Sequence, residues 1–80
     1  MPRFLLQHRH EPSDCGVVFA SFKGHDSPLR HEDVLASCTF GDHGIWWVVE
    51  ADSEADALGQ LPFYVAERAT ATRVDWVAVP

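Results

Sequence analysis

The chain has 80 residues, of which 46% are hydrophobic and 22% charged, a composition typical of a single globular domain. Its formal net charge is −6, an acidic balance that repels phosphate backbones, and no cluster of Lys or Arg offsets it. The composition therefore argues against nucleic-acid binding. A core of this size supplies little stability, and two cysteines make no disulfide framework, so we expect oligomerisation or a metal ion to supplement it.

The N-terminal segment has only a short apolar run, Phe4-Leu5-Leu6, before polar residues return. A signal peptide needs about 7–15 apolar residues and a membrane helix about 20. We therefore expect a cytoplasmic protein that does not contact membranes, with Cys15 and Cys38 present as reduced thiols.

The first half of the chain predicts a strand, a short helix and a loop. Alternating residues indicate a strand over residues 4–10, which Pro12 then interrupts. Ser13 or Asp14 is a suitable cap for a helix over residues 15–22, although β-branched and aromatic residues within that stretch also fit a strand. Residues 24–33 are expected to form a loop, because they contain Gly, Ser and Pro, which interrupt helices and strands.

The middle of the chain predicts a hairpin. Residues 34–40 and 45–51 are expected to be strands joined by Gly41-Asp42-His43-Gly44, which is a strong turn signal. One face of the second strand is wholly apolar and suits the core: Ile45, Trp47, Val49 and Ala51. The other face ends in a charge: Trp46, Val48 and Glu50.

The last third predicts a helix and a final strand. Ser53 caps a helix whose first turn is acidic, and Pro62 marks a kink or a second short helix. Residues 70–79 alternate as a strand. The order β-α-β-β-α-β over residues 1–80 predicts an α+β, ferredoxin-like domain whose four-stranded antiparallel sheet carries both helices on one face. We expect a second copy to cover the open face, which gives a homodimer around a ligand-sized space.

Residues 38–74 carry motifs that resemble a known family: the Phe40-Gly41-Asp42-His43-Gly44 hairpin, the aromatic strand 45–51, Ser53-Glu54-Ala55-Asp56-Ala57 and Leu61-Pro62-Phe63-Tyr64. They resemble the muconolactone isomerase-like branch of the dimeric α/β-barrel superfamily. The resemblance implies two sheets paired into a barrel, and for some members isomerisation or oxygenation of small aromatic-derived compounds.

His8 and His10 are candidate metal ligands. They lie two apart on the first expected strand, so their Cα atoms are ~6.6 Å apart and their side chains point the same way. Two imidazoles at this spacing can share a Zn or Ni ion, and the thiolate of Cys15 is a natural third ligand, with Glu11 and Asp14 as further candidates.

The expected topology sorts these candidates by sheet end. We take the first and third strands to be parallel, which gathers five residues at one end: His8, His10, Cys15, Glu50 and Asp75. Cys38 and His43 then lie at the opposite end unless the partner subunit brings them across, so a Cys38 ligand from the same chain is disfavoured.

Small-ligand binding is the first functional hypothesis. Trp46, Trp76 and Glu50 would line the space between the sheets, and His8, His10, His43 or Glu50 would move protons in isomerase-like chemistry. The structural alternative is that both tryptophans fill the dimer core and Glu50 lies in water. Transition-metal binding is the second hypothesis and a non-catalytic interaction module the third. No phosphate loop, Gly-x-Ser-x-Gly or His-Glu-x-x-His motif supports nucleotide-dependent or hydrolytic activity.

Overall fold

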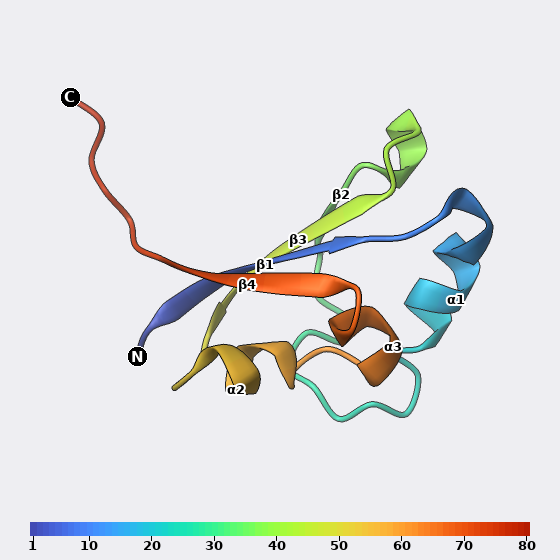
Figure 1. Ribbon diagram of the computed structural model, residues 1–80, viewed down its shortest axis with the longest axis horizontal. Coiled ribbons are helices and arrows are strands. Elements are labelled where there is room, and N and C mark those ends of the chain that lie inside the picture. Colours follow the sequence, from blue (N-terminus) through green and yellow to red (C-terminus); the bar gives the residue numbers. More distant parts are fainter.

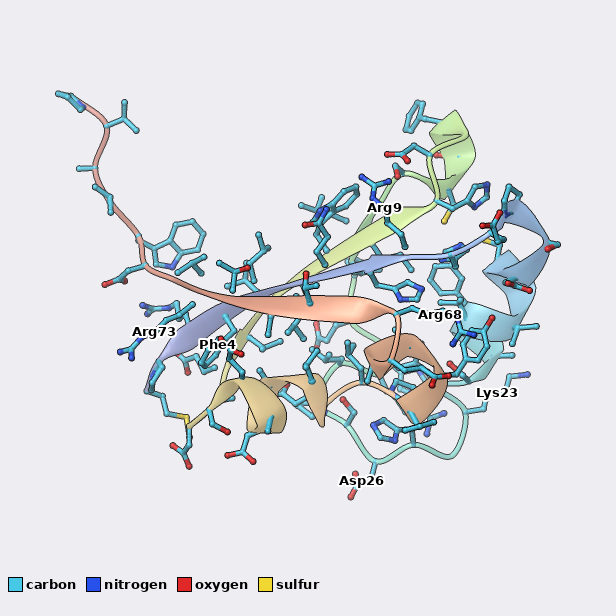
Figure 2. All side chains as sticks on the ribbon, viewed as in Figure 1. Phe4, Arg9, Lys23, Asp26, Arg68 and Arg73 are labelled. Atoms are coloured by element: carbon cyan, nitrogen blue, oxygen red, sulfur yellow. The ribbon has the colours of Figure 1, made fainter.

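Alternating apolar residues form the two central strands of the fold. The computed structural model, which describes residues 1–80, places β1 (Arg3–Arg9) beside β3 (Gly44–Glu50). The side chains that point to one face of this pair are buried: Phe4, Leu6 and His8 from β1, and Ile45, Trp47 and Val49 from β3. Phe4 lies between β1 and the helical layer (Figure 2). The expected apolar face of β3 is therefore confirmed as the core face.

The sheet has four strands in the order β2-β3-β1-β4, and every neighbouring pair is antiparallel. β2 (Leu35–Ala36) and β4 (Ala69–Val74) form its edges. The expectation that the first and third strands run parallel is wrong, because Arg9 pairs with Gly44 and Arg3 with Glu50. β2 runs in the direction of β1 with β3 between them, so the end of β1 meets the start of β3.

Three short α-helices lie on one side of the sheet (Figure 1). α1 (Cys15–Ala20) follows a 3₁₀ turn, η1 (Pro12–Asp14), so the strand alternative for this stretch is wrong. α2 (Glu54–Leu58) is capped by Ser53, whose Oγ accepts a hydrogen bond from the Asp56 amide at 3.1 Å. Pro62 begins a second short helix, α3 (Phe63–Ala66), as the sequence predicts. None of these helices is both long and apolar enough to cross a membrane.

Two expected strands are shorter than the sequence suggests. The one expected over residues 34–40 ends at Ala36, because Ser37 closes the hairpin: its amide donates to the Gly44 carbonyl at 2.9 Å, and its Oγ accepts from the Gly44 amide at 3.0 Å. Cys38–Phe40 then forms a 3₁₀ turn, η2, which Gly41 ends in the left-handed conformation with φ = 87°. The last strand ends at Val74, and the chain beyond it extends away from the sheet (Figure 1).

The core consists of ten buried apolar side chains from the sheet and the helices. The uncovered face of the sheet is also partly apolar, since Val48 is 50% exposed and Leu35 76% exposed. Trp76, on the C-terminal extension, is 74% exposed. The accessible surface is 5473 Å² for an 8.9 kDa chain. A compact monomer of this mass exposes about 4,800 Å², and the exposed C-terminal extension contributes to the difference.

We expect a second copy to cover the open face, and a charge placed there tests this. Val48→Glu puts a carboxylate at the centre of the face and should shift the protein from dimer to monomer in sedimentation velocity. Phe63→Glu is the matched control, because Phe63 is 81% exposed on α3, on the other side of the sheet. A monomeric parent protein, or dissociation by the control substitution alone, would contradict this interface.

Candidate metal centre

Two histidines and two cysteines meet at the end of the sheet where β1 finishes. His10, Cys15, Cys38 and His43 each offer one ligand atom, and these atoms all lie within 4.8 Å of one another. All four side chains are half-buried. They come from two segments that are distant in the sequence, residues 10–15 and 38–43, so only the folded chain assembles the whole group.

The antiparallel pairing of β1 with β3 sets the positions of the two histidines. Beyond the last paired residues, Arg9 and Gly44, the His10 amide donates to the His43 carbonyl at 3.1 Å. The two residues are thus directly opposite each other one step past the ladder. Their ring centroids are 5.2 Å apart in an edge-to-face arrangement.

Tight turns bring the two cysteines to the same place. η1 reverses the chain after β1, with the Asp14 amide donating to the Glu11 carbonyl at 2.9 Å, so that Cys15 returns toward His10 as the first residue of α1. Cys38 directly follows Ser37, whose bonds to Gly44 close the β2–β3 hairpin. Each cysteine therefore sits at the start of a helical turn anchored to the sheet.

The measured separation within the group suits tetrahedral coordination. Cys38 Sγ lies 3.6 Å from His10 Nε2. In a tetrahedron with a Zn–S bond of about 2.3 Å and a Zn–N bond of about 2.0 Å, the S–N edge is about 3.5 Å. The other ligand atoms are close enough to reach a shared ion with small side-chain rotations.

His43 supplies a second observation that points to a ligand. Its Nδ1 is buried and has no hydrogen-bond partner, and no other buried side-chain nitrogen or oxygen is left in this state. An unpaired buried polar atom costs about 1–3 kcal/mol. A ligand that uses this nitrogen would remove that cost.

Electrostatics favour the neutral forms of His10 and Cys38 before any ion binds. Burial lowers the pKa of the His10 imidazole, and the neighbouring His43 lowers it further, while Asp14 opposes both effects. Burial raises the pKa of the Cys38 thiol, and the hydrogen bond and charge of Cys15 raise it further. Neutral imidazoles are ready to ligate a metal, whereas the thiols must release their protons to a cation that binds.

A polar surface cavity of about 510 Å³ opens beside the group and gives an ion a route to it. None of its nine lining residues is hydrophobic: Arg9, His10, Glu11, Pro12, Asp14, Gly41, Asp42, His43 and Arg68. Arg9, labelled in Figure 2 near the hairpin, pairs with Asp42, and Arg68 pairs with Glu67. Glu11 and Asp14 remain at the cavity, and their carboxylates favour the approach of a cation.

The structure brings together some of the residues singled out in the sequence and separates others. His10 and Cys15 meet as expected, but the placement of Cys38 and His43 at the opposite end of the sheet is wrong, because it assumed parallel central strands. His8 does not belong to the group. It is buried beneath His10, and each of its ring nitrogens has a hydrogen-bond partner.

The candidate ligand-binding residues do not converge on one space. Glu50 lies at the far end of β3, 3.7 Å from the guanidinium of Arg3, which also contacts Asp75 at 3.3 Å. Trp46 is half-buried on the open face and borders a cavity of about 370 Å³ there. Trp76 is on the exposed C-terminal extension.

Comparison with known proteins adds no relative to this description. No family model matches the chain, and neither a curated protein nor a solved structure matches it. The chain is thus described by its own features: an α+β protein with a four-stranded antiparallel sheet and a His₂Cys₂ group that could hold a metal ion. The resemblance to muconolactone isomerase-like proteins stays a prediction.

The lowered pKa values of His8 and His10 predict how the stability of the metal-free protein depends on pH. The unfolded chain takes up protons at these histidines near pH 6.5, before the folded chain does. The free energy of unfolding should therefore fall as the pH drops below about 6.5, and these groups should contribute no slope well above it.

Urea unfolding in the presence of a chelator, at several pH values from about 8 down to about 5.5, measures this slope. His31→Asn is the matched control, because His31 is an exposed loop residue with φ = 66°, a conformation that Asn tolerates. The control should keep the slope. A parent protein whose stability is flat across this range would contradict the prediction.

Proposed function

We propose that the protein binds a transition-metal ion, with Zn²⁺ as the best fit, through His10, Cys15, Cys38 and His43. The observation that carries the proposal is the convergence of four donor atoms from two separate segments, residues 10–15 and 38–43, within 4.8 Å. The unpartnered Nδ1 of His43 and the polar cavity beside the group support it independently.

The donor set favours zinc over other ions. Two thiolates and two imidazoles are the ligands of tetrahedral structural zinc sites, and soft thiolates disfavour Mg²⁺ and Ca²⁺. Nickel is the second candidate, because imidazole and thiolate also suit Ni²⁺ in a square-planar arrangement. The 3.6 Å separation of Cys38 Sγ from His10 Nε2 fits a tetrahedral edge and so favours zinc.

The proposed role of the ion is structural. Four protein ligands close the coordination sphere and leave no position for a substrate. The ion would tie the end of β1, the start of α1 and the β2–β3 hairpin together, in a chain whose core has only ten buried apolar side chains. Small domains of this kind commonly use a metal where the core alone is marginal.

A nucleophilic role for the same residues has less support. A Cys38–His10 dyad would need a thiolate, but burial raises the pKa of Cys38 and keeps the thiol protonated. The small-ligand hypothesis has the support of the cavity beside Trp46, but Glu50 and Trp76 do not reach that cavity's lining. Metal binding is therefore the function that the arrangement supports best.

We also infer that the domain is ferredoxin-like. The split β-α-β pattern expects β1 and β3 at the centre, antiparallel to each other, with the helices on one face. The order β2-β3-β1-β4 and the one-sided helical layer support this inference. A second copy on the open face would complete the dimeric barrel that the sequence resemblance implies.

Cobalt titration tests the metal site directly. Chelator-stripped, reduced protein should take up one Co²⁺ per chain, with the visible bands of a tetrahedral ion and thiolate-to-metal charge transfer, and Zn²⁺ should displace it. Cys38→Ser should weaken binding by more than the 10- to 100-fold typical for loss of an outer hydrogen-bond partner. His31→Asn should bind as the parent does. Sub-stoichiometric uptake of Co²⁺, or uptake that is unchanged in Cys38→Ser, would contradict the proposal.

Zinc should also stabilise the fold, because the unfolded chain does not hold the four ligands together. At a free Zn²⁺ concentration a thousand times the dissociation constant, the free energy of unfolding should rise by about 4 kcal/mol. For a domain of this size that corresponds to an increase in Tm of at least about 15 °C. Calorimetry with and without Zn²⁺ measures the shift, and a Tm that does not move would contradict a structural role.

A further inference from the structure

His8 is the one buried polar side chain of the protein, and the metal group does not include it. It is 0% exposed and lies on the core face of β1, in a row with Phe4 and Leu6. Both of its ring nitrogens have partners. Nδ1 is 3.1 Å from the carbonyl oxygen of Val65, and Nε2 is 3.1 Å from Nδ1 of His10.

These two contacts determine which nitrogens carry protons. A carbonyl oxygen only accepts, so the Nδ1–H of His8 donates to Val65. In a neutral imidazole the other nitrogen is then an acceptor, so Nε2 of His8 accepts from the Nδ1–H of His10. His10 is left with an unprotonated Nε2, and this is the nitrogen that lies 3.6 Å from Cys38 Sγ.

The neutral state of His8 follows from its surroundings. No carboxylate contacts its ring, and an unpaired charge at a fully buried position is strongly disfavoured. Burial lowers the pKa of His8, and the nearby His10 lowers it too, while the Val65 carbonyl opposes these effects only in part. The Val65 carbonyl, which can only accept, therefore sets the direction of both hydrogen bonds.

We propose that His8 is a positioning residue for the metal site: it holds His10 in the Nδ1–H tautomer and aims the lone pair of Nε2 at the ion. This inference rests on the proposed metal-binding function. A ligand imidazole whose other N–H has an acceptor is oriented and made more basic, and here that acceptor is a second imidazole anchored to the backbone.

The anchor of this chain of hydrogen bonds is α3. Val65 is fully buried, and its carbonyl lies in the last turn of the helix, where a carbonyl lacks the usual amide donor four residues ahead. This carbonyl also accepts from the Arg68 amide at 3.1 Å. The packing of α3 against the sheet thus sets the orientation of a side chain at the proposed metal site.

Two variants separate the hydrogen bonds of His8 from its volume. His8→Leu fills the site with an apolar side chain and offers His10 no acceptor. His8→Gln keeps an amide oxygen that accepts from His10 and an NH₂ group that donates to Val65. Val65→Ala is the matched control, because it removes a buried side chain on the same path but keeps the backbone carbonyl.

The first measurement uses metal-free protein, so that it does not depend on metal binding. Long-range ¹H–¹⁵N correlation spectra report the tautomer of each histidine ring. We expect His10 as the Nδ1–H tautomer in the parent, in His8→Gln and in Val65→Ala, and loss of this fixed tautomer in His8→Leu. A parent in which His10 is the Nε2–H tautomer would overturn the inference.

The second measurement is Co²⁺ affinity. His8→Leu should lower it about 10- to 100-fold, which is the range typical for removing the outer partner of a ligand histidine. His8→Gln should restore most of the loss, and Val65→Ala should bind as the parent does even where its Tm is lower. Unchanged affinity in His8→Leu would overturn the positioning role. A parent with the expected tautomer that binds no Co²⁺ would refute the proposed function and the role of His8 at the metal, while the hydrogen-bonded chain itself would stand.

Discussion

The antiparallel pairing of β1 with β3 is the constraint on which the rest of the structure depends. It places the end of one central strand beside the start of the other, so that His10 and His43 face each other across the last backbone hydrogen bond. The turns after β1 and before β3 then carry Cys15 and Cys38 to the same point. At the opposite end of the pair the charged side chains form exposed ion pairs of Arg3 with Glu50 and Asp75, which contribute little stability.

The sequence predicted most of the helices and strands, but it did not predict the direction of β3 relative to β1. Local signals predicted the Ser53 cap, the helix after Pro62 and the buried face of β3, because each depends on neighbouring residues. The direction of β3 relative to β1 depends on how the long segment between them returns, and no short-range pattern encodes that path. Half of the metal group was therefore missed. The split β-α-β order itself, with its central strands antiparallel, was the signal that would have found Cys38 and His43.

His8 shows why the alternation of residues along a strand does not by itself identify the role of a side chain. Its position, two residues before His10 on the same face, is equally consistent with a shared metal ion and with a core site. What separates the two is the carbonyl of Val65, which is 57 residues away in the sequence and gives Nδ1 a partner inside the core. Burying a histidine whose two ring nitrogens both have hydrogen-bond partners costs little free energy. A His8 side chain that turned toward an ion at the surface would leave its place in the core unfilled, or its Nδ1 without a partner.

The same geometry connects the hydrophobic core to the candidate metal group. Leu6 and His8 are successive members of one buried row, and His10 is the first of that row to leave the core. An ion bound by His10, Cys15, Cys38 and His43 would therefore hold the end of β1 against the hairpin. Through His8, it would also hold this end against α3. Since these elements are separated by long stretches of chain, an ion that links them would oppose local opening in parts of the fold that no local contact holds together. The metal group and the small core are thus two parts of one arrangement, joined at a single pair of histidines.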